Sequence, residues 1–358
     1  MNLKIVLLPH TDYGDLIMNQ AVKCIRAIEE NYNHHFTTTT LDSLERESGF
    51  WLKEEVLKSC RNSDAILSSF PITQNKFYQN SAQKSLNLIQ LLDCQASVAP
   101  ILSFPEVLYK SKKNKVNATA DFVIFSALKA GQYALNPDNH KPNSDIYTPN
   151  IQGIHQLFHL AFKTAKNRNR KLLVVTPNGP RKIALWDKTL AEISLSYPMV
   201  QVSKKSMDEV MSLLFNNPKH LDCVFADEIM GPILQSQSKA ISEMNVTLPM
   251  AHTGMGINLF EPLYHIDTAL LTSDPNPISA IYCVALMLSR FGLQEEASAI
   301  QLAINSAANR GMFGFEQQLP KHLSCDQLGD FISAAIIDAD DIGEINDENI
   351  DLGKSTII

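Results

Sequence analysis

The stretch LDCVFADEIMGPILQS, residues 221–236, places a buried strand, a tight turn and the start of a helix in immediate succession. Apolar residues fill 223–226, two acids follow at Asp227 and Glu228, and helical spacing of apolar residues then begins. A strand with no polar side that leads straight into a helix is typical of a sheet covered on both faces. This unit therefore indicates an α/β fold.

The same alternation of apolar strands and amphipathic helices recurs along most of the chain. Strands are predicted over 3–9, 64–69, 120–128, 171–177 and 221–226. Helices are predicted over 15–30, with Asp15 as its N-cap, and over 85–92, 154–167, 184–197, 207–217 and 277–291. Such alternation predicts a central sheet with helices on both of its faces.

Composition restricts the class of protein. The chain has 358 residues, of which 45% are hydrophobic and 19% charged, which is enough for two lobes with cores of their own. Its net charge is −7, but seven acids and one lysine lie within 338–358, so that tail carries −6 and the rest about −1. A nearly neutral body gives little electrostatic drive toward nucleic acid, so no nucleic-acid partner is expected.

Two further observations concern the compartment. No apolar stretch approaches the ~18 residues of a membrane span, so no membrane partner is expected. The six cysteines are scattered singly, without a CxxC pair, which favours reduced thiols and a cytoplasmic protein.

Few residues match a general catalytic or metal-binding pattern. His155 and His159 lie four apart on a predicted helix, where they either share a partly buried face or hold a metal, although no third ligand is near in sequence. The basic run KTAKNRNRK (163–171) is interpreted as a solvated helix end rather than a phosphate site. No P-loop, GxGxxG, GxSxG or HExxH motif is present.

Two longer segments resemble one known family. The segment NLFEPLYHIDTALLTSDPNPISAIYCVALMLSRFGLQEEA (258–297) is similar to the end of the β-decarboxylating dehydrogenases, where FEP and NP motifs occur in the same order. The run 171–249 aligns with that family without a gap, and Asn178, Trp186 and Asp208 are among the positions in register. The chain therefore resembles the isocitrate and isopropylmalate dehydrogenases over nearly its whole length.

This resemblance implies a three-layer α/β/α fold with two lobes that share a central sheet. It implies a large lobe of residues 1–100 plus 247–337 and a small lobe of residues 101–246. The Asn- and Pro-rich stretch 136–150 would then belong to an arm that clasps a second copy in a homodimer. The acidic tail 338–358 is predicted to be disordered.

The resemblance also implies a chemistry. In this family a 2-hydroxy acid is oxidised by hydride transfer to NAD or NADP while Mg²⁺ or Mn²⁺ polarises the oxygen. Tyr133 matches a tyrosine that moves protons, and Asp208 matches the first metal carboxylate, so these two are the candidate catalytic residues. Asn276 and Pro277 match the NP pair beside the adenine and are the candidate cofactor contacts.

Several family positions have changed, beginning with the metal site. The second and third metal carboxylates are replaced by Pro232 and Ser236, and the family's lysine by Thr176. Mg²⁺ held by a single carboxylate depends on other anions in the site. Asp227 and Glu228 either approach the metal position from another direction or form a solvated turn.

The substrate and cofactor sites have changed too. The arginines that clamp the substrate carboxylates are replaced by Ser126, Ile89 and Ala99, the last two on a helix taken to run over 85–100. The glycine-containing turns near the cofactor have become bulkier at His10 and at His265.

The resemblance leaves two classes of function open. The first is a noncatalytic or diverted relative, a pseudoenzyme with a binding or regulatory role, alone or in a hetero-oligomer with a related subunit. The other is a divergent NAD(P)-dependent oxidoreductase that uses Tyr133 and Asp208. A structural or interaction protein tethered by its acidic tail is a third possibility.

Overall fold

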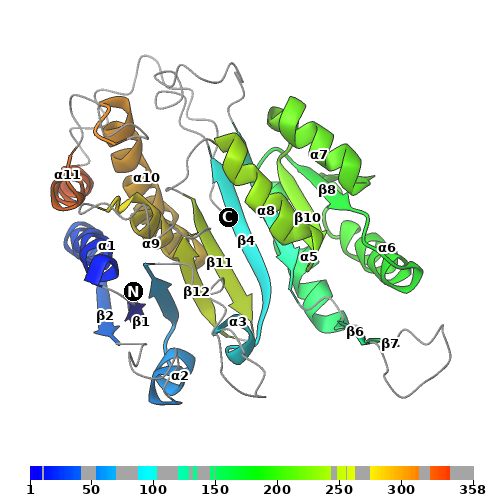
Figure 1. Cartoon of the computed structure of the whole chain (residues 1–358), viewed down its shortest axis with the longest axis horizontal. Coiled ribbons are helices and arrows are strands. Elements are labelled where there is room, and N and C mark those ends of the chain that lie inside the picture. The colour runs from blue at the N-terminus through cyan, green and yellow to red at the C-terminus, as the bar shows by residue number, and fades with distance from the viewer. Residues whose placement is uncertain are drawn as a thin grey trace.

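The computed structural model describes residues 1–9, 12–41, 54–69, 88–102, 120–128, 132–134, 146–148, 150–242, 248–254, 256–262, 275–313 and 323–338. Ten of its strands form one mixed sheet in the order β2-β1-β3-β12-β11-β4-β5-β10-β8-β9 (Figure 1). They are β1 Asn2–Leu8, β2 His35–Thr40, β3 Ala65–Ser68, β4 Cys94–Leu102, β5 Asp121–Ala127, β8 Lys171–Val175, β9 Gln201–Lys205, β10 Cys223–Asp227, β11 Pro249–Gly254 and β12 Asn258–Pro262. A separate antiparallel ribbon joins β6 Gln132–Ala134 to β7 Ile146–Thr148.

The centre of the sheet is antiparallel and its flanks are parallel. Strand β4 lies between β11 and β5 and pairs antiparallel with both. On one flank β1 is parallel to β2 and β3, and on the other β10 is parallel to β5 and β8. The chain thus enters the second flank after β4 and returns through β11, so one sheet spans both halves of the molecule.

Helices cover both faces of this sheet, which gives three layers. They are α1 Asp12–Tyr32, α2 Glu54–Arg61, α3 Leu88–Leu91, α5 Ile151–Asn167, α6 Pro180–Ser194, α7 Met207–Asn216, α8 Met230–Ser242, α9 Ile278–Arg290, α10 Gln294–Asn309 and α11 Cys325–Ile337, with a 3₁₀ turn at Pro218–His220. One face, which carries Leu7 and Phe125, packs against α1, α9, α10, α11, α5 and α6. The opposite face, which carries Leu8 and Ile124, packs against α2, α3, α7 and α8.

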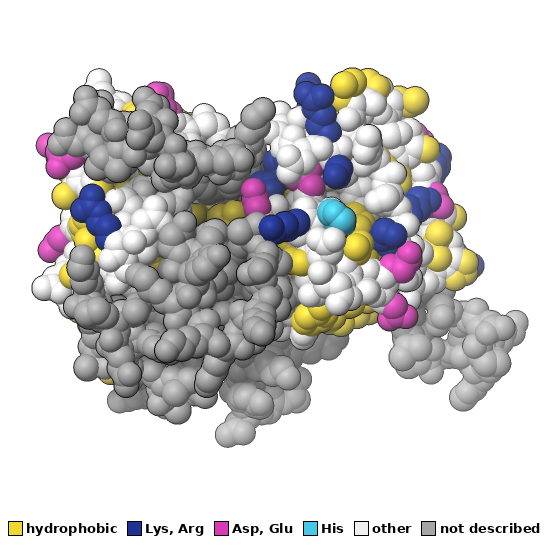
Figure 2. Space-filling model, turned by 90° about the horizontal axis from the view of Figure 1, so that it is seen from above, with side chains coloured by type: hydrophobic (Ala, Val, Ile, Leu, Met, Phe, Trp, Pro, Cys, Tyr) yellow, Lys and Arg dark blue, Asp and Glu magenta, His cyan; other side chains and the backbone are white. Residues whose placement is uncertain are grey.

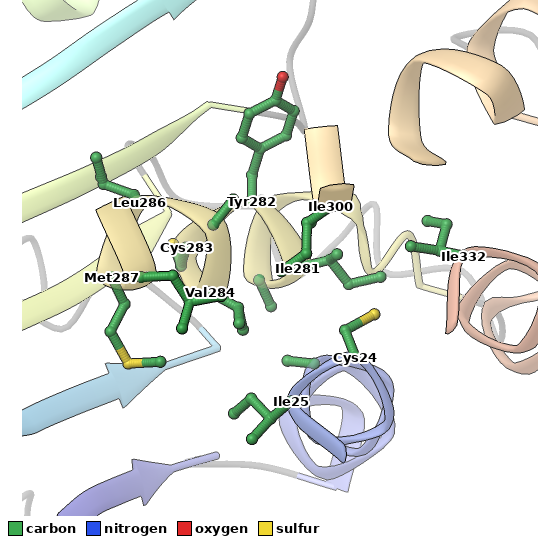
Figure 3. Close-up of a cluster of buried hydrophobic side chains, with 14 of the residues drawn as sticks. Cys24, Ile25, Ile281, Tyr282, Cys283, Val284, Leu286, Met287, Ile300 and Ile332 are labelled. Atoms are coloured by element: carbon green, nitrogen blue, oxygen red, sulfur yellow. The ribbon is translucent and has the colours of Figure 1, made fainter. Parts of the chain in front are cut away.

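Helix α9 shows why the apolar run predicted as a helix has no polar side. Every residue from Ile278 to Ser289 is buried. Figure 3 shows Cys24 and Ile25 of α1, Ile300 of α10 and Ile332 of α11 gathered around it. A helix that is apolar on all sides has to be enclosed, and here the sheet and three helices enclose it.

The α/β fold class predicted from the sequence is confirmed, and each predicted strand is present within two residues of its expected bounds. The helix taken to run over 85–100 is wrong in its second half, because β4 begins at Cys94. Pairing with β11 and β5 satisfies the backbone there, and that pairing outweighs local helical spacing. Asp15 is not an N-cap, because α1 begins three residues earlier at Asp12.

Some predictions fall partly outside the described residues. Of the predicted arm 136–150, the structure describes β7 and Asn150, whose side chain caps α5 by accepting from the amide of Gly153. The tail is described only at Asp338. Within the described part of the chain, no helix is long and apolar enough to cross a membrane. The lobe boundaries stay a prediction.

The charged surface above the sheet is mixed in sign. Figure 2 looks down on the molecule from above the view of Figure 1. On the half that carries α6, α7 and α8, basic, acidic and hydrophobic side chains are interspersed on this face. This distribution agrees with the near-neutral charge of the body.

Candidate active site

Three of the residues matched to family positions lie at or just after the ends of β5, β8 and β10, namely Ser126, Thr176 and Pro232. The chain leaves β8 through a short turn into α6, and leaves β10 through Asp227 and Glu228 into α8. Both strands run parallel, so both turns lie at the same edge of the sheet. In open α/β sheets ligands bind outside the carboxyl ends of the strands, so this edge is the place to look for a site.

Asp227 is buried at this edge and fully engaged. Its side chain is 1% exposed, and its Oδ1 accepts from the backbone amides of Ile229 at 3.1 Å and Met230 at 2.8 Å. Its Oδ2 accepts from Nζ of Lys182 at 3.1 Å. The prediction of a solvated turn is therefore wrong for Asp227, which caps α8 and forms an ion pair.

Lys182 completes this cluster from α6. Its side chain is 1% exposed, and its Nζ lies 2.7 Å from each carboxylate oxygen of Glu228. The same Nζ lies 5.9 Å from the ring centroid of Trp186, one turn further along the helix. Both acids of the turn thus pair with the same buried ammonium, and the cluster keeps a formal charge of −1.

The metal positions themselves carry one carboxylate. Pro232 and Ser236 lie one turn apart on α8, and both are exposed. Asp208 is exposed in the first turn of α7, which begins with a capping box between Ser206 and Glu209. Throughout the described residues, no group of three or more His, Cys, Asp or Glu side chains could hold a metal ion. The donor set therefore does not fit a divalent metal.

The positions of the family's arginines are closed. Ala99 of β4 is fully buried opposite Ile124 of β5, within an apolar cluster. Ser126 of β5 is also fully buried, and a Cβ built on Gly231 of α8 would lie 2.0 Å from its Oγ. Ile89 of α3 is partly buried against the cluster beneath α2 and α3. A guanidinium would have no room at Ser126, because the start of α8 lies directly on β5.

The proton-transfer positions are placed separately. Thr176 is half-buried after β8, and its amide donates to the carbonyl of Lys205 at 2.9 Å. Tyr133 lies in the middle of β6, opposite Tyr147 of β7. Asp208 lies in the first turn of α7, which packs on the face of the sheet that carries Ile124.

The candidate cofactor contacts begin a helix. Oδ1 of Asn276 accepts from the amide of Ile278 at 2.9 Å, and Pro277 is the buried residue that precedes α9. The NP pair thus starts α9, and its contact with a nucleotide stays a prediction. His265 and His10, the bulky residues predicted to obstruct the cofactor, lie outside the described residues.

Sequence reasoning missed a buried ion pair at Arg168 and a buried polar contact between His252 and Glu261. Arg168 donates to Asp222 at 3.0 Å and to Asp121 at 2.6 Å, although it belongs to the run interpreted as solvated. Burial lowers the pKa of Arg168, but Asp121, Cys223 and Asp222 together raise it, and the net direction is upward. Nε2 of His252 lies 2.9 Å from Oε1 of Glu261, and both side chains are buried between β11 and β12.

One local signal could have identified Lys182. It lies four residues before the large aromatic Trp186, so both side chains occupy one helix face, and that face is buried. A lysine at such a position needs a carboxylate nearby. By contrast, the predicted pair His155 and His159 lies partly exposed on α5, with Nε2 of His155 3.9 Å from Glu192 and Nδ1 of His159 3.4 Å from Tyr197.

Comparison with known proteins identifies the family. The 3-isopropylmalate dehydrogenase of Priestia megaterium is 27% identical over 370 residues, which cover 96% of this chain and 99% of that protein. The 3-isopropylmalate dehydrogenase of Bacillus caldotenax is 28% identical, covering 96% and 98%. The crystal structure of isocitrate dehydrogenase from Methylococcus capsulatus has the same fold, with a TM-score of 0.71 at 19% identity over 94% of this chain and 99% of that one. The family model described as isocitrate/isopropylmalate dehydrogenase matches residues 4–332, and the chain therefore belongs to the isocitrate/isopropylmalate dehydrogenase family.

Proposed function

We propose that this protein is a noncatalytic or functionally diverted member of its family, with a binding or regulatory role. The observation that carries the proposal is the closure of the arginine position at Ser126. Its side chain is fully buried beneath Gly231, so no residue there reaches a substrate carboxylate. The loss of one charge-assisted hydrogen bond costs ~1.5–3 kcal/mol, and all three arginines are absent.

The metal position supports the same proposal. By resemblance, Asp208 matches the first metal carboxylate, whereas Pro232 and Ser236 stand where the two further carboxylates would be needed. Thr176 replaces the lysine, and a general base typically contributes ~10²–10⁴ to the rate. Each loss alone slows the reaction, and together they remove substrate binding, metal binding and proton transfer.

The experiment combines turnover with ligand binding. Purified protein would be assayed with isocitrate, isopropylmalate, malate and tartrate, each with NAD⁺ or NADP⁺ and with Mg²⁺ or Mn²⁺. No turnover is expected with any pair. Thermal unfolding would be measured with the same cofactors, because a ligand at 100 Kd stabilises the fold by ~2.7 kcal/mol. Turnover above that of a Tyr133→Phe, Asp208→Asn variant would refute the proposal.

A divergent NAD(P)-dependent oxidoreductase is the second candidate. The observation in its favour is that Tyr133 and Asp208 are kept in a chain that aligns end to end with proteins named 3-isopropylmalate dehydrogenase. Such an enzyme would act on an uncharged or differently charged hydroxy compound, since the carboxylate clamps are absent. A dinucleotide-dependent rise in unfolding temperature would favour this candidate over the noncatalytic one.

We further propose that the protein is a cytoplasmic homodimer, or pairs with a related subunit. Phe215 of α7 and Ile229 and Ile233 of α8 are exposed, which is costly for a surface that faces only water. Light scattering after size exclusion would give the mass of the native protein. Ile229→Lys with Ile233→Lys is expected to shift it to 39.9 kDa, whereas Leu195→Lys, at an exposed residue just after α6, is the control.

A further inference from the structure

The acidic turn between β10 and α8 binds the side-chain ammonium of Lys182 from α6. Three carboxylate oxygens, one from Asp227 and two from Glu228, converge on Nζ of Lys182 at 3.1, 2.7 and 2.7 Å. The Lys182 and Asp227 side chains are each 1% exposed and that of Glu228 is 25% exposed. The formal charges of +1 and −2 leave the cluster at −1, which the amides of Ile229 and Met230 and the solvent at Glu228 help to offset.

The remaining acceptor of Asp227 is also satisfied. Its Oδ1 accepts hydrogen bonds from the amides of Ile229, just before α8, and Met230, its first residue. The helix dipole favours negative charge at this end of the helix. The ring of Trp186 lies 5.9 Å from the ammonium and adds a cation–π attraction. The ammonium is thus surrounded by two carboxylates and the face of an aromatic ring, all of which attract a positive charge.

We propose that Lys182 is a built-in cation that takes the place of a divalent metal ion at this turn. Several carboxylate oxygens around one centre are what Mg²⁺ or Mn²⁺ would require. Metal–oxygen bonds are about 2.0–2.6 Å long, so a metal bound to these oxygens would overlap the ammonium and be repelled by it. The two cations exclude each other, and burial keeps Lys182 in place.

This inference goes beyond the proposed function, because it holds whether or not a substrate is turned over. Pro232 and Ser236, one turn further along α8, present no carboxylate to a metal, and Asp227 and Glu228 are already occupied. The turn therefore keeps its structure without a divalent ion. Removal of the ammonium should uncover a cation site formed by the same oxygens.

The test counts bound Mn²⁺ on the full chain by electron paramagnetic resonance. Four proteins would be compared: the natural one, Lys182→Met, Lys182→Met with Glu228→Gln, and Glu228→Gln alone. Glu228 is the partly exposed acid, so its substitution leaves the cap by Asp227 intact. Lys182→Met is expected to bind one Mn²⁺ per chain more than the natural protein, and the double variant to lose it again.

Melting temperature provides the second measurement. Lys182→Met should melt several degrees below the natural protein in EDTA and recover at least half of that loss in Mn²⁺. The natural protein should melt at the same temperature in both. If Lys182→Met is recovered only unfolded, refolding with Mn²⁺ but not with EDTA should restore its circular dichroism.

Two results would overturn the inference. One is a Lys182→Met protein that neither binds additional Mn²⁺ nor is stabilised or refolded by it. The other is Mn²⁺ binding by the natural protein that disappears in Glu228→Gln, because these oxygens would then already serve a metal.

Discussion

Ser126 offers a direct test of how β5 and the start of α8 are packed. Its hydroxyl is fully buried on β5, and none of the described residues gives its Oγ a hydrogen-bond partner. A buried hydroxyl without a partner costs ~1–3 kcal/mol relative to one that stays hydrated. Ser126→Ala removes that cost and keeps the Cβ that packs against Gly231.

The magnitude follows from two opposing terms. The void left by one oxygen atom is roughly 15 Å³, and at ~24 cal/mol per Å³ it costs about 0.4 kcal/mol. The net expectation is that Ser126→Ala raises the free energy of unfolding by about 0.6–2.6 kcal/mol. The assay is urea unfolding followed by circular dichroism, with an increased midpoint and an unchanged m-value.

Ser97 provides a matched control. It lies directly opposite Ser126 in the β4–β5 pair and is equally buried, but its Oγ accepts from Nε2 of Gln235 at 3.2 Å. Ser97→Ala should therefore lower the free energy of unfolding by ~1–3 kcal/mol, because the buried amide loses its acceptor. If Ser126→Ala is destabilised as much as Ser97→Ala, the hydroxyl of Ser126 has a partner and the reasoning fails.

Two further predictions concern buried charge and buried thiols. Arg168→Met should lower the free energy of unfolding by ~3–5 kcal/mol, because Asp222, whose side chain is 2% exposed, would lose its buried cation; a loss below ~1 kcal/mol in urea unfolding would contradict this. All six cysteines are buried, and burial raises the pKa of Cys24 and of Cys60 to about 12. Ellman's reagent should therefore label the native protein very slowly at pH 8. In guanidinium it should label all six thiols. Stoichiometric labelling before unfolding would show that the thiols are accessible.

Much of the fold could be predicted because runs of apolar residues in the sequence indicate which strands are buried. Strands such as β5 and β10 are apolar at consecutive positions, and only a sheet covered on both faces accommodates that pattern. Strand β4 could not be recognised, since a stretch with Gln95 and Ser97 among apolar residues also fits a helix. Its identity depended on hydrogen bonds to β11 and β5, which are distant in sequence.

For the candidate site, the sequence predicted only which of the family's functional residues are replaced. The replacements at Pro232, Ser236 and Ser126 are read from the chain, and the structure adds that Ser126 is sealed beneath α8. The partners of the remaining charged side chains could not be predicted from the sequence. Asp227 and Arg168 lie in polar runs that suggest exposure, yet each is buried with a partner 45 or 54 residues away.

The sequence by itself determined the α/β class and the family, because these depend on residue type and local spacing, and it predicted the replacement of the family's charged site residues. Only the tertiary structure decided which charges are compensated, because ion pairs join residues from different elements. Lys182 of α6 meets Asp227 at the end of β10 since β8 and β10 are neighbours in the sheet. That adjacency places an ammonium at a turn where the sequence had shown only two unpaired acids.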